Sequence, residues 1–358
     1  MIHIFTIHSN ITYLAALATI KHENIAQKDI ILICNSNYSP VLPKGYKFRF
    51  IYNTTDFVTS FTDRLNKFLP FSYSKKTNAF IKEITCNNKY IVYLDLMSSF
   101  NKYLVFNKNC IRFNIIEEGI VNYGEFIDFN LLTADKKNNH WIWQNKNHLK
   151  EFFYGVLRLY RGRSFKMQSL PIHPNVYSQF SNVTSFCFSE LAFPNTSSKN
   201  KTILNFNSLN TYELETNFYQ EHTWFWIGDV LCKQYGIGLN VLKTAIVKLL
   251  EKINPEKKFH LIYLKFRGSE PEEEKNLTLK LLKEYGFTVK ILNKSTILEI
   301  VFANNSNLNV CGIASSLLIY AFNAGHKTYS ALPYLPDNYN ISIYKSYPQI
   351  YSKVYENQ

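Results

Sequence analysis

The sequence of 358 residues has little glycine and proline, 12 and 11 residues, so collagen-like and low-complexity chains are excluded. Its six cysteines are widely separated, with no C-x-x-C pair and no metal-ligand spacing, which predicts free thiols in a reducing compartment. No apolar run reaches the length of about 18 residues that crosses a bilayer. The opening residues, MIHIFTIHSN, lack the features of a signal peptide. We therefore expect a cytoplasmic protein.

Apolar residues are plentiful in this chain. They make up 46% of it, and aromatic residues alone make up 16%, which is enough apolar surface for packed cores and excludes a disordered protein. At about 150 residues per domain, the length predicts two domains.

Positive charge is in excess, because 40 lysines and arginines stand against 27 acidic residues, a net charge of +13. This excess favours an anionic partner: nucleic acid, an acidic membrane surface or a phosphorylated substrate. Nucleic acid is not expected, since the chain has no polybasic arm and no basic stripe interleaved with aromatic residues. The densest basic run, Arg158, Arg161, Arg163 and Lys166, fits a solvated helix end or a peripheral contact with an anionic membrane.

Strands and helices alternate through the first half. Continuous apolar runs are typical of strands that are covered on both faces. The expected strands are Ile2–His8, Asp29–Cys34, Lys47–Tyr52, Lys89–Leu96 and Arg112–Ile116, and the expected helices are Ile11–Lys21 and Asp56–Phe68. This order predicts an α/β fold with a parallel sheet wrapped by helices.

A polar segment, PNTSSKN, interrupts this pattern between Phe193 and Lys201. We place the domain boundary there, with domains at 1–194 and 195–337, and expect a C-terminal helix at 338–358 that packs back on the N-terminal domain. Beyond the boundary the alternation restarts, with strands expected at Thr202–Phe206, Thr223–Ile227, Phe259–Lys265, Thr288–Leu292, Asn309–Cys311 and Thr328–Ala331 and helices at Leu239–Ile253, Glu272–Tyr285 and Ile313–Ala324. The chain is thus expected to fold into two Rossmann-like α/β domains that face a cleft.

Residues that directly follow strands are the candidates for chemistry, because ligands of such sheets bind beyond the carboxyl ends of the strands. In the first half, Glu117 and Glu118 follow a strand and precede Gly119, which permits a sharp turn. Adjacent carboxylates raise one another's pKa, which suits a general base near neutral pH. The alternative interpretation of this triplet is a solvated turn.

Two post-strand segments of the second half could bind a ligand. Gly228 allows close backbone approach of a ligand, and Asp229 beside it is either a further candidate base or a helix cap. Lys265 and Arg267 place two cations near a helix start, which suits a phosphate group or, alternatively, a capped helix with solvated charges.

A third segment of the second half opens an apolar helix with small and hydroxyl residues, Gly312, Ser315 and Ser316. Free N–H groups at a helix N-terminus bind anions, although plain capping by a serine explains the same pattern. No D-x-D motif is present, and we expect no metal and no other cofactor.

The order of these segments resembles the bacterial sialyltransferases of glycosyltransferase family 52, which act in lipooligosaccharide synthesis, and the related capsular polysialyltransferases. The acidic-acidic-glycine motif of these families is matched by NIIEEGIVNYG, and their serine motif by VCGIASSLLIYA. The stretches YLDLMSSFNKYLV and WFWIGDVL are also similar to those families. The Lys-x-His-Pro motif is not matched, because the chain reads Lys265-Phe266-Arg267-Gly268 there.

The resemblance implies a GT-B architecture and an inverting transfer of sialic acid from CMP-sialic acid to a bacterial surface glycan. Glu118 would deprotonate the acceptor hydroxyl, with Glu117 and Asp229 as second and third choices for the base. Lys265 and Arg267 would bind the phosphate, and Arg267 would act as a fixed cation because arginine cannot donate a proton at neutral pH.

Two other functions stay open at this point. Because the family histidine is missing, a glycosyltransferase with a UDP-sugar donor is the first alternative. The second is a catalytically silent glycan-binding subunit of a capsule assembly, which would also lack this histidine. The pair His173-Pro174 lies in the first half, away from the expected position, and is interpreted as a loop. The acceptor, the linkage and the oligomeric state, a homodimer included, do not follow from the sequence.

Overall fold

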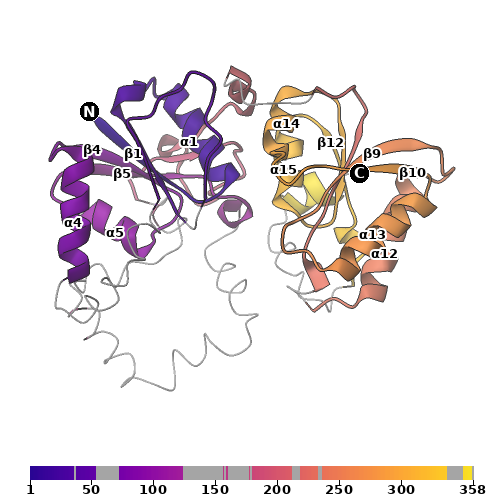
Figure 1. The fold of residues 1–358 in the computed structure, drawn as a ribbon. Helices are drawn as coiled ribbons and strands as arrows, with labels where there is room; N and C mark the ends of the chain where they lie inside the picture. Colours follow the sequence, from indigo (N-terminus) through magenta and orange to yellow (C-terminus); the bar gives the residue numbers. More distant parts are fainter. Residues whose placement is uncertain are drawn as a thin grey trace. The chain divides into compact units, whose positions relative to one another are not determined.

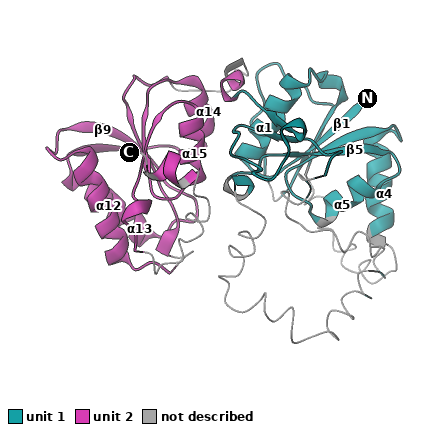
Figure 2. Ribbon diagram, turned by 180° about the vertical axis from the view of Figure 1, so that it is seen from behind, with its two compact units in different colours: residues 1–205 teal, residues 206–358 magenta. Residues whose placement is uncertain are grey.

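The computed structural model describes residues 1–35, 38–53, 72–123, 156, 159, 177, 180–211, 218–232, 236–336 and 350–356. The expected helix at Asp56–Phe68, the four basic residues of the run Arg158, Arg161, Arg163 and Lys166, and the pair His173-Pro174 lie outside these residues. Within them, no helix is both long and apolar enough to cross a membrane. The chain divides into two compact units, Met1–Asn205 and Phe206–Gln358, which are coloured separately in Figure 2.

Unit 1 is built on a parallel sheet of seven strands in the order β3-β2-β1-β4-β5-β6-β7. The strands are β1 Ile2–Ile7, β2 Ile30–Cys34, β3 Phe50–Asn53, β4 Tyr90–Leu94, β5 Cys110–Ile116, β6 Ser185–Cys187 and β7 Lys201–Ile203. The central strands are buried on both faces, as their continuous apolar runs predict. Helix α1 (Asn10–His22) lies on one face, and α4 (Ser72–Thr85) and α5 (Ser99–Phe106) lie on the other (Figure 1).

The expected domain boundary at residue 194 falls inside unit 1 and is corrected by the sheet. Strand β7, which the sequence assigned to the second domain, pairs in parallel with β6 through Phe186 and Thr202. The polar segment PNTSSKN therefore connects the last two strands of one sheet, and the division of the chain comes after Asn205. A polar segment of this kind is typical both of a linker between domains and of a crossover connection between two parallel strands of one sheet, so composition alone did not separate the two.

Unit 2 contains a parallel sheet of five strands in the order β10-β9-β8-β11-β12. The strands are β8 Trp224–Ile227, β9 His260–Lys265, β10 Phe287–Ile291, β11 Asn309–Gly312 and β12 Lys327–Ser330, and the helices are α12 Leu239–Ile253, α13 Glu272–Glu284, α14 Leu298–Asn304 and α15 Ser316–Asn323. Helices α12 and α13 lie on one side of the sheet, and α14 and α15 on the other (Figure 1). Each unit is thus a doubly wound α/β domain.

The described end of the chain, residues 350–356 of the expected helix at 338–358, packs on unit 2. A short π-helical segment, η6 (Tyr351–Glu356), lies against β12 and α15. The hydroxyl of Thr328 donates to the carbonyl of Val354 at 3.2 Å, and the hydroxyl of Tyr355 donates to the carbonyl of Ser315 at 3.3 Å. Val354 and Tyr355 are fully buried, so this segment completes the core of the unit that contains it.

Candidate active site

The strand order places one topological switch point in each sheet. In unit 1 the chain runs outward from β1 through β2 to β3 and then returns to β4 on the other side of β1. In unit 2 the corresponding reversal lies between β8 and β11. In open parallel sheets, the space beyond the carboxyl ends of the two strands at such a point is where ligands bind. The residues that directly follow these four strands are therefore the first to consider.

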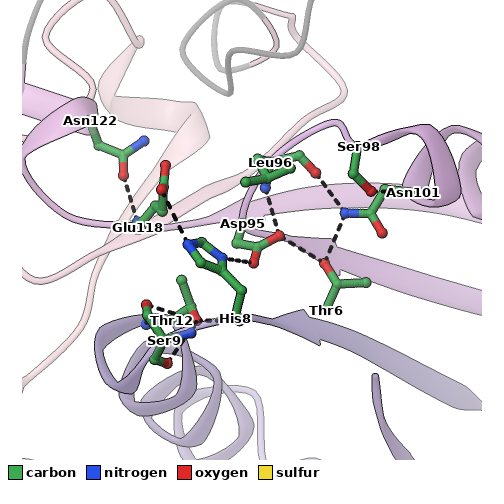
Figure 3. A network of polar contacts seen from close by, with 10 residues as sticks. All are labelled: Thr6, His8, Ser9, Thr12, Asp95, Leu96, Ser98, Asn101, Glu118 and Asn122. Atoms are coloured by element: carbon green, nitrogen blue, oxygen red, sulfur yellow. Dashed lines mark hydrogen bonds and ion pairs between the residues drawn. The ribbon is translucent and has the colours of Figure 1, made fainter. Parts of the chain in front are cut away.

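His8 follows β1, Asp95 follows β4, and their side chains meet at the switch point of unit 1. His8 Nδ1 lies 2.5 Å from Oδ2 of Asp95, although the two residues are 87 positions apart in the chain. Asp95 is completely buried, whereas about a fifth of the His8 side chain is exposed. The pair is drawn at the centre of Figure 3. A buried carboxylate that binds one ring nitrogen fixes the orientation of an imidazole.

Polar groups from three segments hold Asp95 in place. Its Oδ1 accepts hydrogen bonds from the hydroxyl of Thr6 at 3.1 Å and from the backbone N–H of Leu96 at 2.7 Å. Asn101 in turn donates to the Thr6 oxygen at 3.2 Å and to the carbonyl of Leu96 at 2.6 Å. Ser98 caps α5 by accepting from the N–H of Asn101. This network, shown in Figure 3, satisfies the buried carboxylate and limits its movement.

Glu118, the residue expected to act as the base, reaches His8 from the end of β5. Its Oε1 lies 3.3 Å from Nε2 of His8, and about a fifth of its side chain is exposed. The N–H of Glu118 donates to Oδ1 of Asn122 at 2.6 Å, which closes the turn that contains Gly119. At Gly119 the φ angle is +135°, a conformation that favours glycine. His8 therefore bridges two carboxylates, one buried and one in contact with solvent.

Glu117, the second choice for the base, is completely buried. Its Oε1 accepts from the hydroxyl of Tyr123 at 2.7 Å, and its Oε2 accepts from the backbone N–H of Phe188 at 2.7 Å. Both oxygens are thus engaged in holding the loop after β5 to the residues after β6. These contacts describe a structural carboxylate and leave Glu118 as the member of the pair that faces outward.

The two carboxylates change the protonation of His8. Burial disfavours the charged imidazole, but the hydrogen bonds to Asp95 and Glu118 outweigh this effect and raise the pKa of His8 to about 10. His8 is therefore an imidazolium at neutral pH. In this state both ring nitrogens are donors, so the ring can orient Glu118 through Nε2 while Nδ1 remains bound to Asp95.

Neither His8 nor Asp95 was among the residues singled out from the sequence. The rule that selected Glu118, namely that polar residues directly after parallel strands gather at one edge, applies equally to His8 and Asp95. What the sequence lacked was the strand order, because only the adjacency of β1 and β4 in the sheet shows that these two residues belong together.

In unit 2, Asp229 lies at the switch point between β8 and β11. Only 6% of it is exposed, and it accepts hydrogen bonds from the N–H of Val230 at 2.9 Å and from the N–H of Ala314 at 3.2 Å. Burial raises the pKa of Asp229, against the hydrogen bonds and the nearby Arg267 charge, which lower it. Nη1 of Arg267 lies 3.5 Å from Oδ1 of Asp229, with more than half of the arginine side chain exposed. Asp229 thus anchors an arginine that remains open to solvent.

A buried carboxyl group that the sequence did not single out, Glu270, lies beside Asp229. Its Oε2 accepts from the N–H of Arg267 at 3.1 Å, and a Cβ at Gly228 would collide with the same oxygen. The packing of the Glu270 side chain therefore requires a glycine at position 228, and this explains Gly228 without the ligand that was expected there from the sequence. Burial, in the first place, and repulsion from Glu274 and Asp229 raise the pKa of Glu270 to about 8, against the hydrogen bond from Arg267. The residue is neutral at pH 7.

The raised pKa of Glu270 predicts a pH dependence of stability. Below its ordinary pKa of 4.5 both the folded and unfolded chains carry the proton, and stability is intact. Between pH 4.5 and about 8 only the unfolded chain loses the proton, so the free energy of unfolding falls as pH rises. We expect Glu270→Gln to remove the part of this decline that lies between pH 4.5 and 6.5, below the range in which the raised pKa of His8 also lowers stability, measured as the thermal midpoint between pH 4 and 9. Glu272→Gln, on an exposed side chain, is the control, and an unchanged decline in Glu270→Gln would contradict the assignment.

The other cation expected at the donor site, Lys265, is engaged elsewhere. Its ammonium group donates to the carbonyls of Asn293 and Lys294 at 2.7 and 2.6 Å. Burial lowers the pKa of Lys265, and the nearby carboxylate of Glu299 opposes this effect. Lys265 therefore ties β9 to the loop after β10, and Arg267 is the cation of the pair that is directed to solvent.

The segment after β11 is arranged as a helix start. Ser315 caps α15, since its hydroxyl accepts from the N–H of Leu317 at 3.3 Å, and Ser316 is the first residue of the helix. Gly312, the last residue of β11, lies close to β8: a Cβ there would be 3.2 Å from the carbonyl of Ile227. The structure therefore shows the capping role of Ser315 and a packing role for Gly312. In the part of the chain that is described, no group of three or more metal-ligating side chains is present.

Comparison with known proteins identifies the fold. No protein-family model matches the sequence, and no curated protein matches it. A sialyltransferase from Photobacterium damsela is similar with a TM-score of 0.50 at 11% identity, covering 98% of this chain and 78% of that one. MurG from Acinetobacter baumannii has a TM-score of 0.42 at 10% identity, covering 99% and 86%. The expected fold is confirmed: the chain is an α/β protein with two parallel sheets, in the manner of GT-B glycosyltransferases.

Proposed function

We propose that this chain is an inverting glycosyltransferase of the sialyltransferase type, which transfers sialic acid from CMP-sialic acid to a bacterial surface glycan. The observation that carries the proposal is the bridge Asp95–His8–Glu118 at the switch point of unit 1, with one buried and one accessible carboxylate. The motif around Glu118 that resembles family 52 supports the choice of sugar. The likeness of fold supports the reaction class.

In the proposed reaction, Glu118 accepts the proton of the acceptor hydroxyl. The acceptor oxygen forms a bond to the anomeric carbon while the bond from that carbon to the phosphate oxygen breaks, so the configuration inverts and CMP leaves with the bonding electrons. The imidazolium of His8 holds the carboxylate of Glu118 in position. Because Glu118 is already held in one orientation, little conformational entropy is lost when it accepts the proton.

Arg267 is assigned to the phosphate of the donor in unit 2. Its guanidinium is anchored by Asp229 yet largely exposed, so it can bind an incoming phosphate with two parallel N–H groups. Negative charge on the phosphate increases as the glycosidic bond breaks, and a fixed cation stabilises this charge most in the transition state. Arg267 cannot donate a proton, so in this assignment CMP leaves with electrostatic assistance alone.

A second candidate is a glycosyltransferase with a UDP-sugar donor. The observation that favours it is the arginine at the position of the family histidine, because a diphosphate leaving group benefits from a fixed cation and needs no acid. We expect calorimetric titration to show tighter binding of CMP and CMP-sialic acid than of CDP or UDP. A preference for UDP would replace the first proposal with the second.

The catalytically silent subunit is distinguished by a different measurement. Hydrolysis of CMP-sialic acid at high protein concentration reports slow transfer to water and needs no knowledge of the acceptor. We expect CMP release above the uncatalysed rate, and nucleotide binding without any release would favour the glycan-binding function.

A further inference from the structure

Unit 1 contains a polar pocket that the proposed reaction does not use. It has a volume of about 470 Å³ and lies between two consecutive helix-to-strand connections, α4 to β4 and α5 to β5. The pocket is at the amino ends of β4 and β5, whereas Asp95 and Glu118 follow their carboxyl ends. The five residues of β4, at about 3.3 Å each, separate the two places by roughly 17 Å.

Amide side chains form the wall of this pocket. Four of its lining residues are asparagines: Asn78 on α4, Asn87 before β4, and Asn107 and Asn109 before β5. Nδ2 of Asn107 donates to Oδ1 of Asn78 at 3.3 Å, and Nδ2 of Asn109 donates to Oδ1 of Asn87 at 3.1 Å. The N–H of Asn109 also donates to Oδ1 of Asn107 at 3.0 Å. The four residues are thus linked into one row, by two side-chain pairs and the backbone N–H of Asn109, before any ligand arrives.

This row leaves hydrogen-bonding capacity for a ligand. Each amide offers two N–H donors and a carbonyl with two lone pairs, and the contacts within the row use only part of them. Asn87 follows the end of α4 with a left-handed φ of 60°, a conformation that asparagine adopts more readily than most residues, and its N–H donates to the carbonyl of Lys82 at 2.9 Å. Groups that are already ordered lose little entropy on binding. Such a wall matches a ligand rich in hydroxyl groups, which both donate and accept.

The charge of the pocket selects an anionic ligand. Lys82 and Lys108 line it, and among the residues that the structure describes neither has an ion-pair partner. None of the described residues that line the pocket is acidic, so together they carry a net charge of +2. Phe106 adds a partly exposed aromatic side chain at one side, a surface on which the C–H face of a sugar ring can pack.

We propose that this pocket is a second glycan site of unit 1, which binds a carboxylated sugar. The amide row hydrogen-bonds the hydroxyl groups, the two lysines bind the carboxylate, and Phe106 packs against the ring. The choice of a glycan as ligand rests on the proposed function. A chain that engages both this pocket and the candidate active site is held by two contacts, which raises its effective concentration between turnovers.

Binding is tested without donor and without turnover, by saturation-transfer NMR with sialyllactose and, as the neutral counterpart, lactose. We expect sialyllactose to bind and lactose to bind at least ten-fold more weakly. The double variant Lys82→Gln/Lys108→Gln should bind sialyllactose at least ten-fold more weakly than the wild type. The control Lys28→Gln/Lys75→Gln removes two exposed charges elsewhere on unit 1 and should bind as the wild type does.

Asn107→Ala separates a sugar site from a simple anion site. It should weaken the binding of sialyllactose and leave the binding of inorganic phosphate unchanged. Equal binding of lactose and sialyllactose, or equal loss in the two double variants, would each overturn the proposal. So would an Asn107→Ala variant that binds sialyllactose as tightly as the wild type does. Glu118→Gln should bind sialyllactose at this pocket like the wild type. Failure of the nucleotide titrations would contradict the proposed function while leaving this result in place.

Discussion

Glu118→Gln is expected to slow glycosyl transfer by about 10²–10⁴-fold, the usual loss when a general base is removed. Glutamine keeps the size of the side chain and can still contact His8 across the 3.3 Å that now separates Oε1 from Nε2. It cannot accept the proton of the acceptor hydroxyl. Because the donor is assigned to unit 2, nucleotide affinity should stay within about two-fold of the wild type. The measurement is a transfer assay at saturating donor, together with calorimetric titration of CMP.

Matched variants distinguish Glu118 from its neighbours. Glu83→Gln, on an exposed position of α4, removes the same charge from unit 1 and should retain full activity. His8→Gln removes the imidazolium and leaves Glu118 without its partner, so we expect a smaller loss of rate than in Glu118→Gln. If Glu118→Gln remains active, Glu118 is not the base. The base is then His8 if His8→Gln is inactive, or Asp229 if Asp229→Asn is inactive.

Arg267→Ala should weaken nucleotide binding and also slow the chemical step. The guanidinium is an exposed cation beyond the carboxyl end of β9, and its charge matters most as the phosphate leaves. Loss of one such contact is expected to cost about 2–4 kcal/mol in the transition state, by analogy with the loss of an oxyanion donor. The thermal midpoint should be measured on the same variant, because the buried carboxyl group of Asp229 loses its charged partner. Steady-state kinetics and calorimetry on the same variant give both quantities.

Two further variants make this prediction specific. Lys248→Ala removes an exposed charge from α12 in the same unit and should leave both quantities unchanged. Arg267→His places an imidazole at the position of the family histidine and should introduce a new pH dependence near its ordinary pKa of about 6.5. If Arg267→Ala changes neither affinity nor turnover, Arg267 does not contact the donor, and the resemblance to family 52 is then wrong at this position.

The local pattern of apolar residues was sufficient to locate most elements. The helix expected at Leu239–Ile253 was confirmed at both ends, and strands β1, β2, β8 and β11 lie within one or two residues of the expected ranges. Periodicity and capping are properties of neighbouring residues, so a single sequence contains them. A single sequence is also enough to apply the rule that ligands bind near residues that directly follow parallel strands. This rule selected Glu118, Asp229 and Arg267 as candidates before any strand order was known.

Strand order and burial, in contrast, depend on contacts between distant parts of the chain. The pairing of β1 with β4 brings His8 to Asp95 across 87 residues, and the pairing of β6 with β7 moves the division of the chain to Asn205. Burial likewise separates Glu117, whose oxygens are both hydrogen-bonded, from Glu118, which reaches solvent. It also keeps Glu270 neutral beside Asp229. Adjacent residues of one type acquire different chemistry because the fold, and not the local sequence, sets what surrounds each side chain.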